Sequence, residues 1–240
     1  MTTAHTLGFR PLYQQVRENL TKRIADGSWR TGEIVPSEIN IATELGVSQG
    51  TVRKALDDMT AANLLVRKQG RGTFVASHDE ARILFQFFKL QPRNGDQVFP
   101  ESEVLDVQRG LADATEAEKL LLTTADPVLR IKRVRSLAGK RAIVEMIILP
   151  AVLFEGLQNS NIPNNLYNAF AQDFGITISG GSERITAVFA SETDINDLGL
   201  QANTPLLQID RVATALDGRP VEWRISRCDT QYIHYVAELR

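Results

Sequence analysis

An internal repeat is the feature that most restricts what this chain can fold into. Residues 111–136 align with residues 189–214 at a constant offset of 78, so that Arg133 falls on Arg211. Each copy reads as a helix and a strand, followed by a glycine turn and a returning strand that carries a glutamate. Two such units predict a pseudo-symmetric sheet, and the seam between its halves is a natural place for a pocket.

The repeat lies within a longer region of alternating apolar runs and helix-like segments, which begins near residue 85. Segments such as ILFQFFKL, VLRIKRVRSL and LLQIDRVATAL read as strands, whereas TEAEKLLL and NNLYNAFAQDFG read as helices. This mixture predicts an antiparallel α+β domain over residues 85–240.

The first part of the chain has a different pattern, with two short helices joined by a tight turn. Ser37 is suited to cap the first helix and Gly46 to end it, while Ser48 is suited to cap the second. This arrangement is typical of a helix-turn-helix that binds DNA. An ordinary helical hairpin is the alternative.

The next segment, residues 65–76, reads as a strand, a QGRG turn and a second strand. Arg67, Lys68 and Arg71 surround the two turn glycines. A structural turn needs the glycines but not three cations, whereas a wing that reaches DNA needs both. The first region is therefore predicted to be a winged helix.

The net charge also differs between the first and second regions of the chain. Residues 1–76 contain 10 Lys/Arg and 7 Asp/Glu, and residues 77–240 contain 17 and 22, so a net +3 region precedes a net −5 region. A basic module joined to an acidic one favours a polyanionic partner for the first. We expect a winged helix at 1–76, a linker at 77–84 and the α+β domain at 85–240.

Residues 10–76, with PLYQQV, VPSE, LGVSQGTVRKALDDM and LLVRKQGRGTFV, resemble the GntR family of bacterial transcriptional repressors, and RKQGRGTFV points to its HutC branch. The resemblance implies a homodimer on a palindromic operator, with the third helix in the major groove and the wing tip in the minor groove. The DNA-binding residues that it implies are Ser37, Ser48, Gln49, Gly50, Thr51, Arg53, Lys68, Gly70 and Arg71.

Two positions depart from the family pattern. Ile39 and Gln49 stand where the family commonly has arginines, while Arg53 keeps its match. Glutamine selects adenine where arginine selects guanine, so the operator is expected to differ from the family's usual one. Gln49 has no evident partner in the sequence, and Gly50 in the first turn of a helix costs about 1 kcal/mol relative to alanine. Close approach of the backbone to DNA would explain that glycine.

The second region resembles the UTRA effector-binding domain, which has a chorismate-lyase-like fold and holds a small anion or sugar phosphate. The matching residues are Arg133, Arg135, Glu145, Tyr167 and Glu222, to which strand alternation adds Arg224. Two guanidiniums on one sheet face suit a carboxylate or phosphate. The alternatives are an ion pair on a solvated face for Arg133, a core position for Tyr167, and structural pairing with arginines for the two glutamates.

The sequence thus predicts a dimeric repressor whose operator affinity responds to a small anionic metabolite. The alternatives are a chorismate-lyase-like enzyme and a ligand-independent architectural DNA-binding protein. The three histidines form no metal-spaced cluster and the single cysteine, Cys228, has no predicted partner, so we expect no catalytic residue, metal or cofactor. With no signal peptide or membrane-spanning run expected, the predicted location is the bacterial cytoplasm, at the nucleoid.

Overall fold

The computed structural model describes residues 11–76, 87–94, 98–159 and 161–237 of the 240-residue chain. The chain separates into two compact units, Met1–Ser77 and His78–Arg240. The linker expected at 77–84 lies outside the described residues. Within the described ranges, no helix has both the length and the hydropathy that crossing a bilayer requires.

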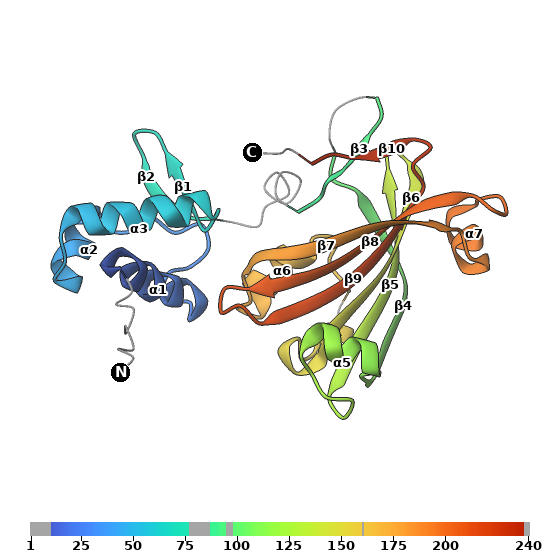
Figure 1. The fold of residues 1–240 in the computed structure, drawn as a ribbon, viewed down its shortest axis with the longest axis horizontal. Helices are drawn as coiled ribbons and strands as arrows, with labels where there is room; N and C mark the ends of the chain where they lie inside the picture. Colours follow the sequence, from blue (N-terminus) through green and yellow to red (C-terminus); the bar gives the residue numbers. More distant parts are fainter. Residues whose placement is uncertain (1–10, 77–86, 95–97, 160, 238–240) are drawn as a thin grey trace, which may run out of the picture. The chain divides into compact units, whose positions relative to one another are not determined.

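In its described residues, the first unit contains three helices and a hairpin that projects away from them (Figure 1). Its elements are α1 (Leu12–Ala25), α2 (Glu38–Leu45), α3 (Gln49–Ala61), β1 (Leu65–Lys68) and β2 (Gly72–Val75). Apolar side chains at helical spacing on α1 and α3 form its core: Val16, Leu20, Ile24, Val52, Leu56 and Met59. The hairpin confirms the predicted wing, with the second strand beginning one residue earlier than expected.

Local hydrogen bonds fix the turn between α2 and α3. The Ser37 hydroxyl accepts a hydrogen bond from the backbone of Asn40, and the Ser48 hydroxyl accepts one from Thr51. Gly46, with φ of 63°, ends α2 in the left-handed region that glycine tolerates best. Both caps and the helix end therefore follow the sequence prediction.

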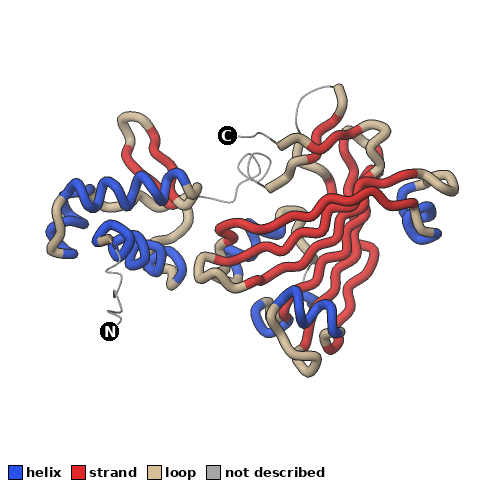
Figure 2. The backbone as a smooth tube through the Cα atoms, viewed as in Figure 1, coloured by secondary structure: helices blue, strands red, loops and turns tan. Residues whose placement is uncertain are grey.

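The second unit is built on a six-stranded antiparallel sheet in the order β4-β5-β6-β9-β8-β7 (Figure 2). Its strands are β4 (Glu101–Leu111), β5 (Pro127–Leu137), β6 (Lys140–Pro150), β7 (Ile178–Phe189), β8 (Pro205–Ala215) and β9 (Pro220–Cys228). A separate pair joins β3 (Leu90–Pro92) to β10 (Ile233–Tyr235). The helical elements are α5 (Ala114–Leu120), α6 (Leu166–Asp173), α7 (Glu192–Leu198) and the 3-10 turns η1 (Ala151–Leu153) and η2 (Leu157–Asn159).

The predicted repeat is visible in the structure. Helix α7 and strand β8 span the positions of α5 and β5 shifted by 78 residues. Each helix begins with a capping box, formed by Asp113 and Glu116 in the first copy and by Ser191 and Asp194 in the second. The two halves meet where β6 pairs with β9, at the centre of the sheet.

Alternation along the strands divides the sheet into two faces. One face carries the main core, in which α6, with Phe170, and the η1–η2 segment pack in one cluster with Ile131 and Ile147 of the sheet. The other face packs against α5, with Trp223 and Ile148 in its cluster, and against α7. The first of these faces holds the charged residues described below.

Adjacent glycines on β7 provide a matched test of sheet packing. A Cβ added at Gly181 would lie 2.7 Å from the backbone oxygen of Val212, whereas one at Gly180 would meet nothing within 4 Å. Gly181→Ala should therefore lower the free energy of unfolding by about 1–3 kcal/mol, and Gly180→Ala should change it by less than about 1 kcal/mol. Urea denaturation of both variants measures this, and equal stabilities would contradict the packing argument.

Candidate functional site

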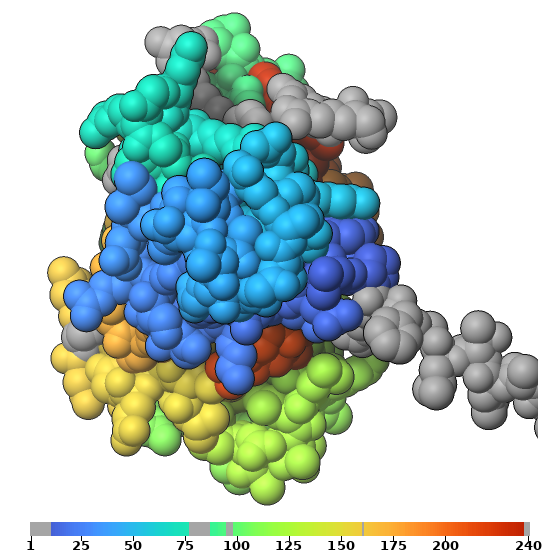
Figure 3. Space-filling model, turned by 90° about the vertical axis from the view of Figure 1, so that its left-hand side faces the viewer, coloured from blue at the N-terminus to red at the C-terminus, as the bar shows by residue number. Residues whose placement is uncertain are grey.

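The start of α3 is exposed and presents several of the residues that the resemblance assigns to DNA. Ser48, Gln49, Gly50 and Arg53 all lie at the surface, and Figure 3 shows the first unit, in blue to cyan, facing the viewer. The first-turn N–H groups of a helix favour anions. The N-terminus of α3 is therefore suited to phosphate or base contacts.

Gly50 is not required by the fold. Its backbone is helical, and a Cβ added there would meet only the Ser48 hydroxyl, at 3.9 Å, which is ordinary van der Waals contact. Alanine would fit and would have the higher helix propensity. No contact among the described residues thus explains this glycine.

The expectation that Gln49 lacks a partner was wrong. Its Nε2 donates to Oε2 of Glu38 at 3.1 Å, across the turn between α2 and α3. Arg53 donates to the same oxygen from Nη2 (2.8 Å) and from Nε (3.0 Å). The Arg53 guanidinium and, to a lesser extent, the Gln49 amide lower the pKa of Glu38. Sequence reasoning missed Glu38 because this contact is tertiary.

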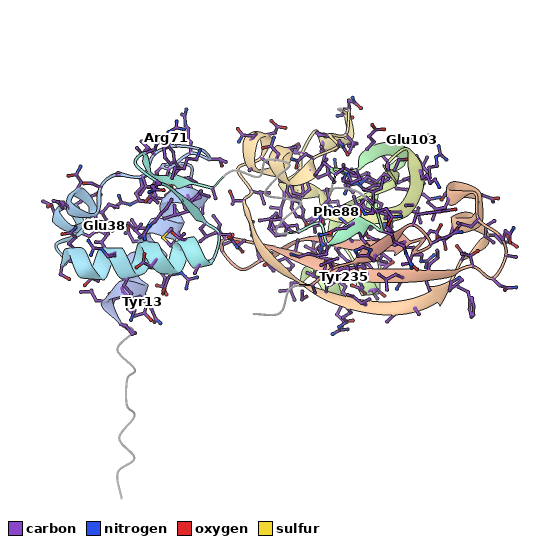
Figure 4. The ribbon with its side chains drawn as sticks, turned by 90° about the horizontal axis from the view of Figure 1, so that it is seen from above. Tyr13, Glu38, Arg71, Phe88, Glu103 and Tyr235 are labelled. Atoms are coloured by element: carbon purple, nitrogen blue, oxygen red, sulfur yellow. The ribbon has the colours of Figure 1, made fainter. Side chains whose placement is uncertain are left out.

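The wing places cations around two glycines with positive φ, Gly70 (70°) and Gly72 (109°). Lys68 lies over the ring of Phe74, with 4.8 Å between Nζ and the ring centroid. Arg71 lies at the tip (Figure 4), where its backbone N–H donates to the carbonyl of Lys68, while its side chain makes no hydrogen bond or ion pair with the described residues. Arg67 instead pairs with Asp57 at 2.5 Å.

Ile39, the other departure from the family pattern, is 63% exposed on α2. An isoleucine at this position buries little apolar surface within the unit. It adds neither charge nor a hydrogen-bond donor to this exposed surface.

In the second unit, four of the six candidate effector residues, Arg133, Arg135, Tyr167 and Arg224, line one pocket, whereas Glu145 and Glu222 are not part of its lining. Its lining comes from β5, β8, β9, the start of α6 and the segments 87–88 and 99. The lining residues are Phe87, Phe88, Phe99, Arg133, Arg135, Asn164, Asn165, Leu166, Tyr167, Arg211 and Arg224. Strands from both halves contribute, which agrees with a pocket at the seam. A second pocket of about 310 Å³ shares Phe87, Tyr167 and Arg211 with it.

Buried ion pairs hold these side chains. Arg133, only 1% exposed, donates from Nε to Glu145 at 2.6 Å, so the alternative of a solvated-face pair is wrong. Arg224 donates to Glu222 at 2.6 Å, and the Tyr167 hydroxyl donates to the other oxygen of Glu222 at 2.9 Å. Both glutamates thus pair with arginines inside the protein, the alternative that the sequence left open.

Arg135 is different, because its charge is poorly matched. It is 3% exposed, and its nearest carboxylate oxygen, on Glu145, is 4.0 Å from Nη1. Among the described residues, its Nε and Nη2 have no hydrogen-bond partner. The rings of Phe88 (Figure 4) and Phe99 flank the guanidinium, with centroids at 5.1 and 5.3 Å. Burial and the neighbouring Arg133 lower the pKa of Arg135 well below its ordinary value.

Sequence reasoning missed Arg211 and Glu183. Arg211 donates from Nε to Glu183 at 2.6 Å and also donates to the carbonyl of Phe87. The repeat held the signal, since Arg211 falls on Arg133. The returning strands differ, however, because Arg133 faces Glu145 across the ladder while Arg211 faces Arg224. Glu145 and Glu222 are therefore not equivalent positions.

No metal site accompanies these residues. In the parts of the chain that the structure describes, no three His, Cys, Asp or Glu side chains are grouped so that they would hold a metal ion. The single cysteine, Cys228, is buried, and burial raises the pKa of its thiol well above the ordinary value.

An exposed helix-turn-helix with a basic wing, followed by a domain with a charged pocket, defines a ligand-responsive type of DNA-binding protein. Residues 12–75 match the model of the bacterial regulatory proteins of the gntR family, and residues 96–234 match the UTRA domain. The chain belongs to the GntR family, with the helix-turn-helix and UTRA domains of its HutC-like members.

Similar proteins agree with this assignment. The transcriptional regulator SmoD of Agrobacterium fabrum is 30% identical, over 98% of this chain and 99% of its own length. MngR of Escherichia coli, a mannosyl-D-glycerate transport/metabolism system repressor, is 29% identical over 90% of this chain and 91% of its own. The structure of PhnF from Mycobacterium smegmatis matches with a TM-score of 0.57 and 26% identity, over 94% of this chain and 99% of PhnF. The chain is therefore a transcription regulator rather than an enzyme.

Glu145 is expected to make stability depend on acid. Burial alone would raise the pKa of Glu145. Arg133, Arg224 and Arg135 outweigh burial and hold this pKa well below its ordinary value. A carboxylate whose pKa is lowered in the folded state contributes its full stabilisation of the fold above its unfolded-state pKa of about 4.3. It loses that contribution as the pH falls from there toward the folded-state pKa. Glu145→Gln should lower the free energy of unfolding at pH 7 by about 3–5 kcal/mol. Below about pH 5, the free energy of unfolding of this variant should fall less steeply with pH than that of the unsubstituted protein.

Urea denaturation between pH 7 and pH 3 measures both effects. Glu103→Gln is the control, since Glu103 pairs with Arg141 at the surface and its side chain is 58% exposed. That change should cost less than about 1 kcal/mol. Equal pH slopes for the Glu145 variant and the unsubstituted protein would contradict the prediction.

Proposed function

We propose that this protein is a homodimeric repressor that binds a palindromic operator and is controlled by a small anionic metabolite. Arg135 carries the effector half of the proposal, as a buried guanidinium with two nitrogens, Nε and Nη2, that have no hydrogen-bond partner among the described residues. An uncompensated buried cation is costly, and an anion that pairs with it removes that cost.

Charge around the pocket supports an anion. Four arginines (Arg133, Arg135, Arg211 and Arg224) are matched by three glutamates (Glu145, Glu183 and Glu222). The remaining positive charge suits a carboxylate or phosphate, whose oxygens accept hydrogen bonds from the forked N–H groups of arginine. Asn165, which caps α6, and Arg135 line the same pocket, and the N–H groups at a helix start favour anions.

The pocket that Arg135 lines has a volume of only about 20 Å³, and it adjoins a pocket of about 310 Å³ that is within the usual range for small ligands. Its lining is partly apolar and includes Phe87 and Tyr167. MngR is named for a mannosyl-D-glycerate system, and glycerate carries a carboxylate at neutral pH. We therefore favour a sugar acid or sugar phosphate, with Arg133, Arg135, Glu145, Tyr167, Glu222 and Arg224 as its binding residues.

Arg135→Met separates effector binding from folding. Methionine keeps much of the volume between Phe88 and Phe99 but removes the charge, so the free protein should be as stable as before or more stable. An anion at 100 times its Kd should stabilise the unsubstituted protein by about 2.7 kcal/mol and the variant by almost nothing. Thermal unfolding with sugar phosphates, sugar acids and matched neutral sugars measures this.

The control is Arg141→Met, because Arg141 is a surface arginine of the same unit with a side chain that is 45% exposed. It should keep the full response to the anion. Equal stabilisation of the Arg135 variant would contradict the assigned site. No stabilisation of the unsubstituted protein by any compound would favour the ligand-independent architectural alternative.

For the DNA half, we propose that Ser37, Ser48, Gln49, Gly50, Thr51, Arg53, Lys68, Gly70 and Arg71 contact the operator. The exposure of the α3 start and the absence of an internal reason for Gly50 support this assignment. A side chain at position 50 would stand between the helix start and a phosphate or base. Such a regulator would act in the cytoplasm, at the nucleoid.

Gly50→Ala should therefore change folding and binding in opposite directions. The free energy of unfolding should rise by about 0.5–1 kcal/mol, the helix-propensity difference, while operator affinity falls. Urea denaturation and titration of the operator measure the two effects. If operator affinity is unchanged, the glycine is merely tolerated and does not admit close approach.

Ligand control requires a path from the pocket to the rest of the chain. Phe88 stacks on Arg135, and the carbonyl of Phe87 accepts from Arg211, so the segment that directly follows residues 77–86 lies on the proposed site. An effector shifts the equilibrium only by its different affinity for the arrangements that do and do not bind DNA. We propose that residues 77–84 absorb that change.

A further inference from the structure

Glu38 is an unusual residue for a surface that meets a polyanion. It begins α2 directly after the Ser37 cap, and its carboxylate reaches the first turns of α3 (Figure 4). Its side chain is 24% exposed, against 58% for its partner Arg53. A carboxylate beside DNA repels phosphates of every sequence, so it lowers affinity unless it contributes something else.

Its contacts indicate what that contribution is. Gln49 and Arg53 are four residues apart and therefore share one face of α3. Glu38 accepts from both, at 3.1 Å from Gln49 and at 2.8 and 3.0 Å from Arg53. Arg53 is a long side chain with large rotamer entropy, and a forked contact to a carboxylate restricts it before DNA arrives.

We propose that Glu38 is a specificity-determining residue, which positions Arg53 and Gln49 for base edges and opposes their use on phosphates. The inference deepens the proposed function and rests on the placement of α3 against the operator. Held by Glu38, Arg53 is pre-organised for one geometry and is partly neutralised for phosphates. Both effects favour the correct sequence over others, one by improving the right contact and one by weakening the wrong ones.

The test compares a duplex selected by the unsubstituted protein from a random pool with a scrambled duplex of the same composition. Glu38→Gln keeps the size of the side chain and removes its charge. We expect affinity for scrambled DNA to rise several-fold at low salt, with the slope of log K against log salt steeper by about 0.9, the value of one more phosphate contact. The ratio of the two affinities should fall by about tenfold or more.

Glu44→Gln is the matched control. Glu44 lies on the same helix and also accepts two hydrogen bonds from an arginine, at 2.7 and 3.0 Å from Arg23 of α1. Removing this charge should leave the affinity ratio within about twofold of the original. A ratio unchanged in the Glu38 variant, or lowered equally in both variants, would overturn the inference.

A double-substitution cycle tests whether Glu38 acts through Arg53. Combined with Arg53→Ala, the Glu38→Gln change should lower the affinity ratio by less than about half as much, on a logarithmic scale, as it does alone. Equal losses in both backgrounds would overturn the positioning role. If the unsubstituted protein selects no duplex at all, the proposed operator recognition fails instead.

Discussion

Burial of arginine on one face of the six-stranded sheet is the constraint on which the second unit depends. Guanidiniums do not lose their protons under ordinary conditions, so Arg133 and Arg224 need anions inside the protein. Glu145 and Glu222 supply them and are as buried as the arginines. Because a slip of one residue moves a side chain to the opposite face, these pairs favour a single register for the central strands.

The site arises where the repeat ceases to be symmetric. On the face of α5 and α7 the symmetry is close, since Lys119 pairs with Asp210 and Lys132 pairs with Asp197, with the charges exchanged between positions 78 apart. On the pocket face, the register between β8 and β9 is shifted by one residue relative to that between β5 and β6, since Arg133 pairs with Glu145 but Arg211 pairs with Arg224. Arg224 consequently stands where the first half has Glu145. The repeat accounts for the sheet, and the shift in register accounts for the excess of arginine where the two halves of the sheet meet.

Local signals explain how much the sequence predicted. The caps at Ser37 and Ser48, the wing and the repeat are properties of neighbouring residues or of spacing, and the structure contains all of them. The partner of Gln49 was not predictable in this way, because Glu38 approaches it only through the angle between two helices. Glu183 was missed for a related reason, since its pairing with Arg211 depends on the register between β7 and β8.

The two units use arginine in opposite ways. Arg53 is mostly exposed, so its ion pair with Glu38 is screened by solvent and adds little stability, and the guanidinium stays accessible to DNA while Glu38 holds it. Arg135 is enclosed by aromatic rings, where each electrostatic interaction is stronger and an unmatched charge persists until an anion enters. On the proposed function, the free energy for switching comes from the buried arginine. Phe88 then connects the effector site to the start of the unit, because it contacts Arg135 directly.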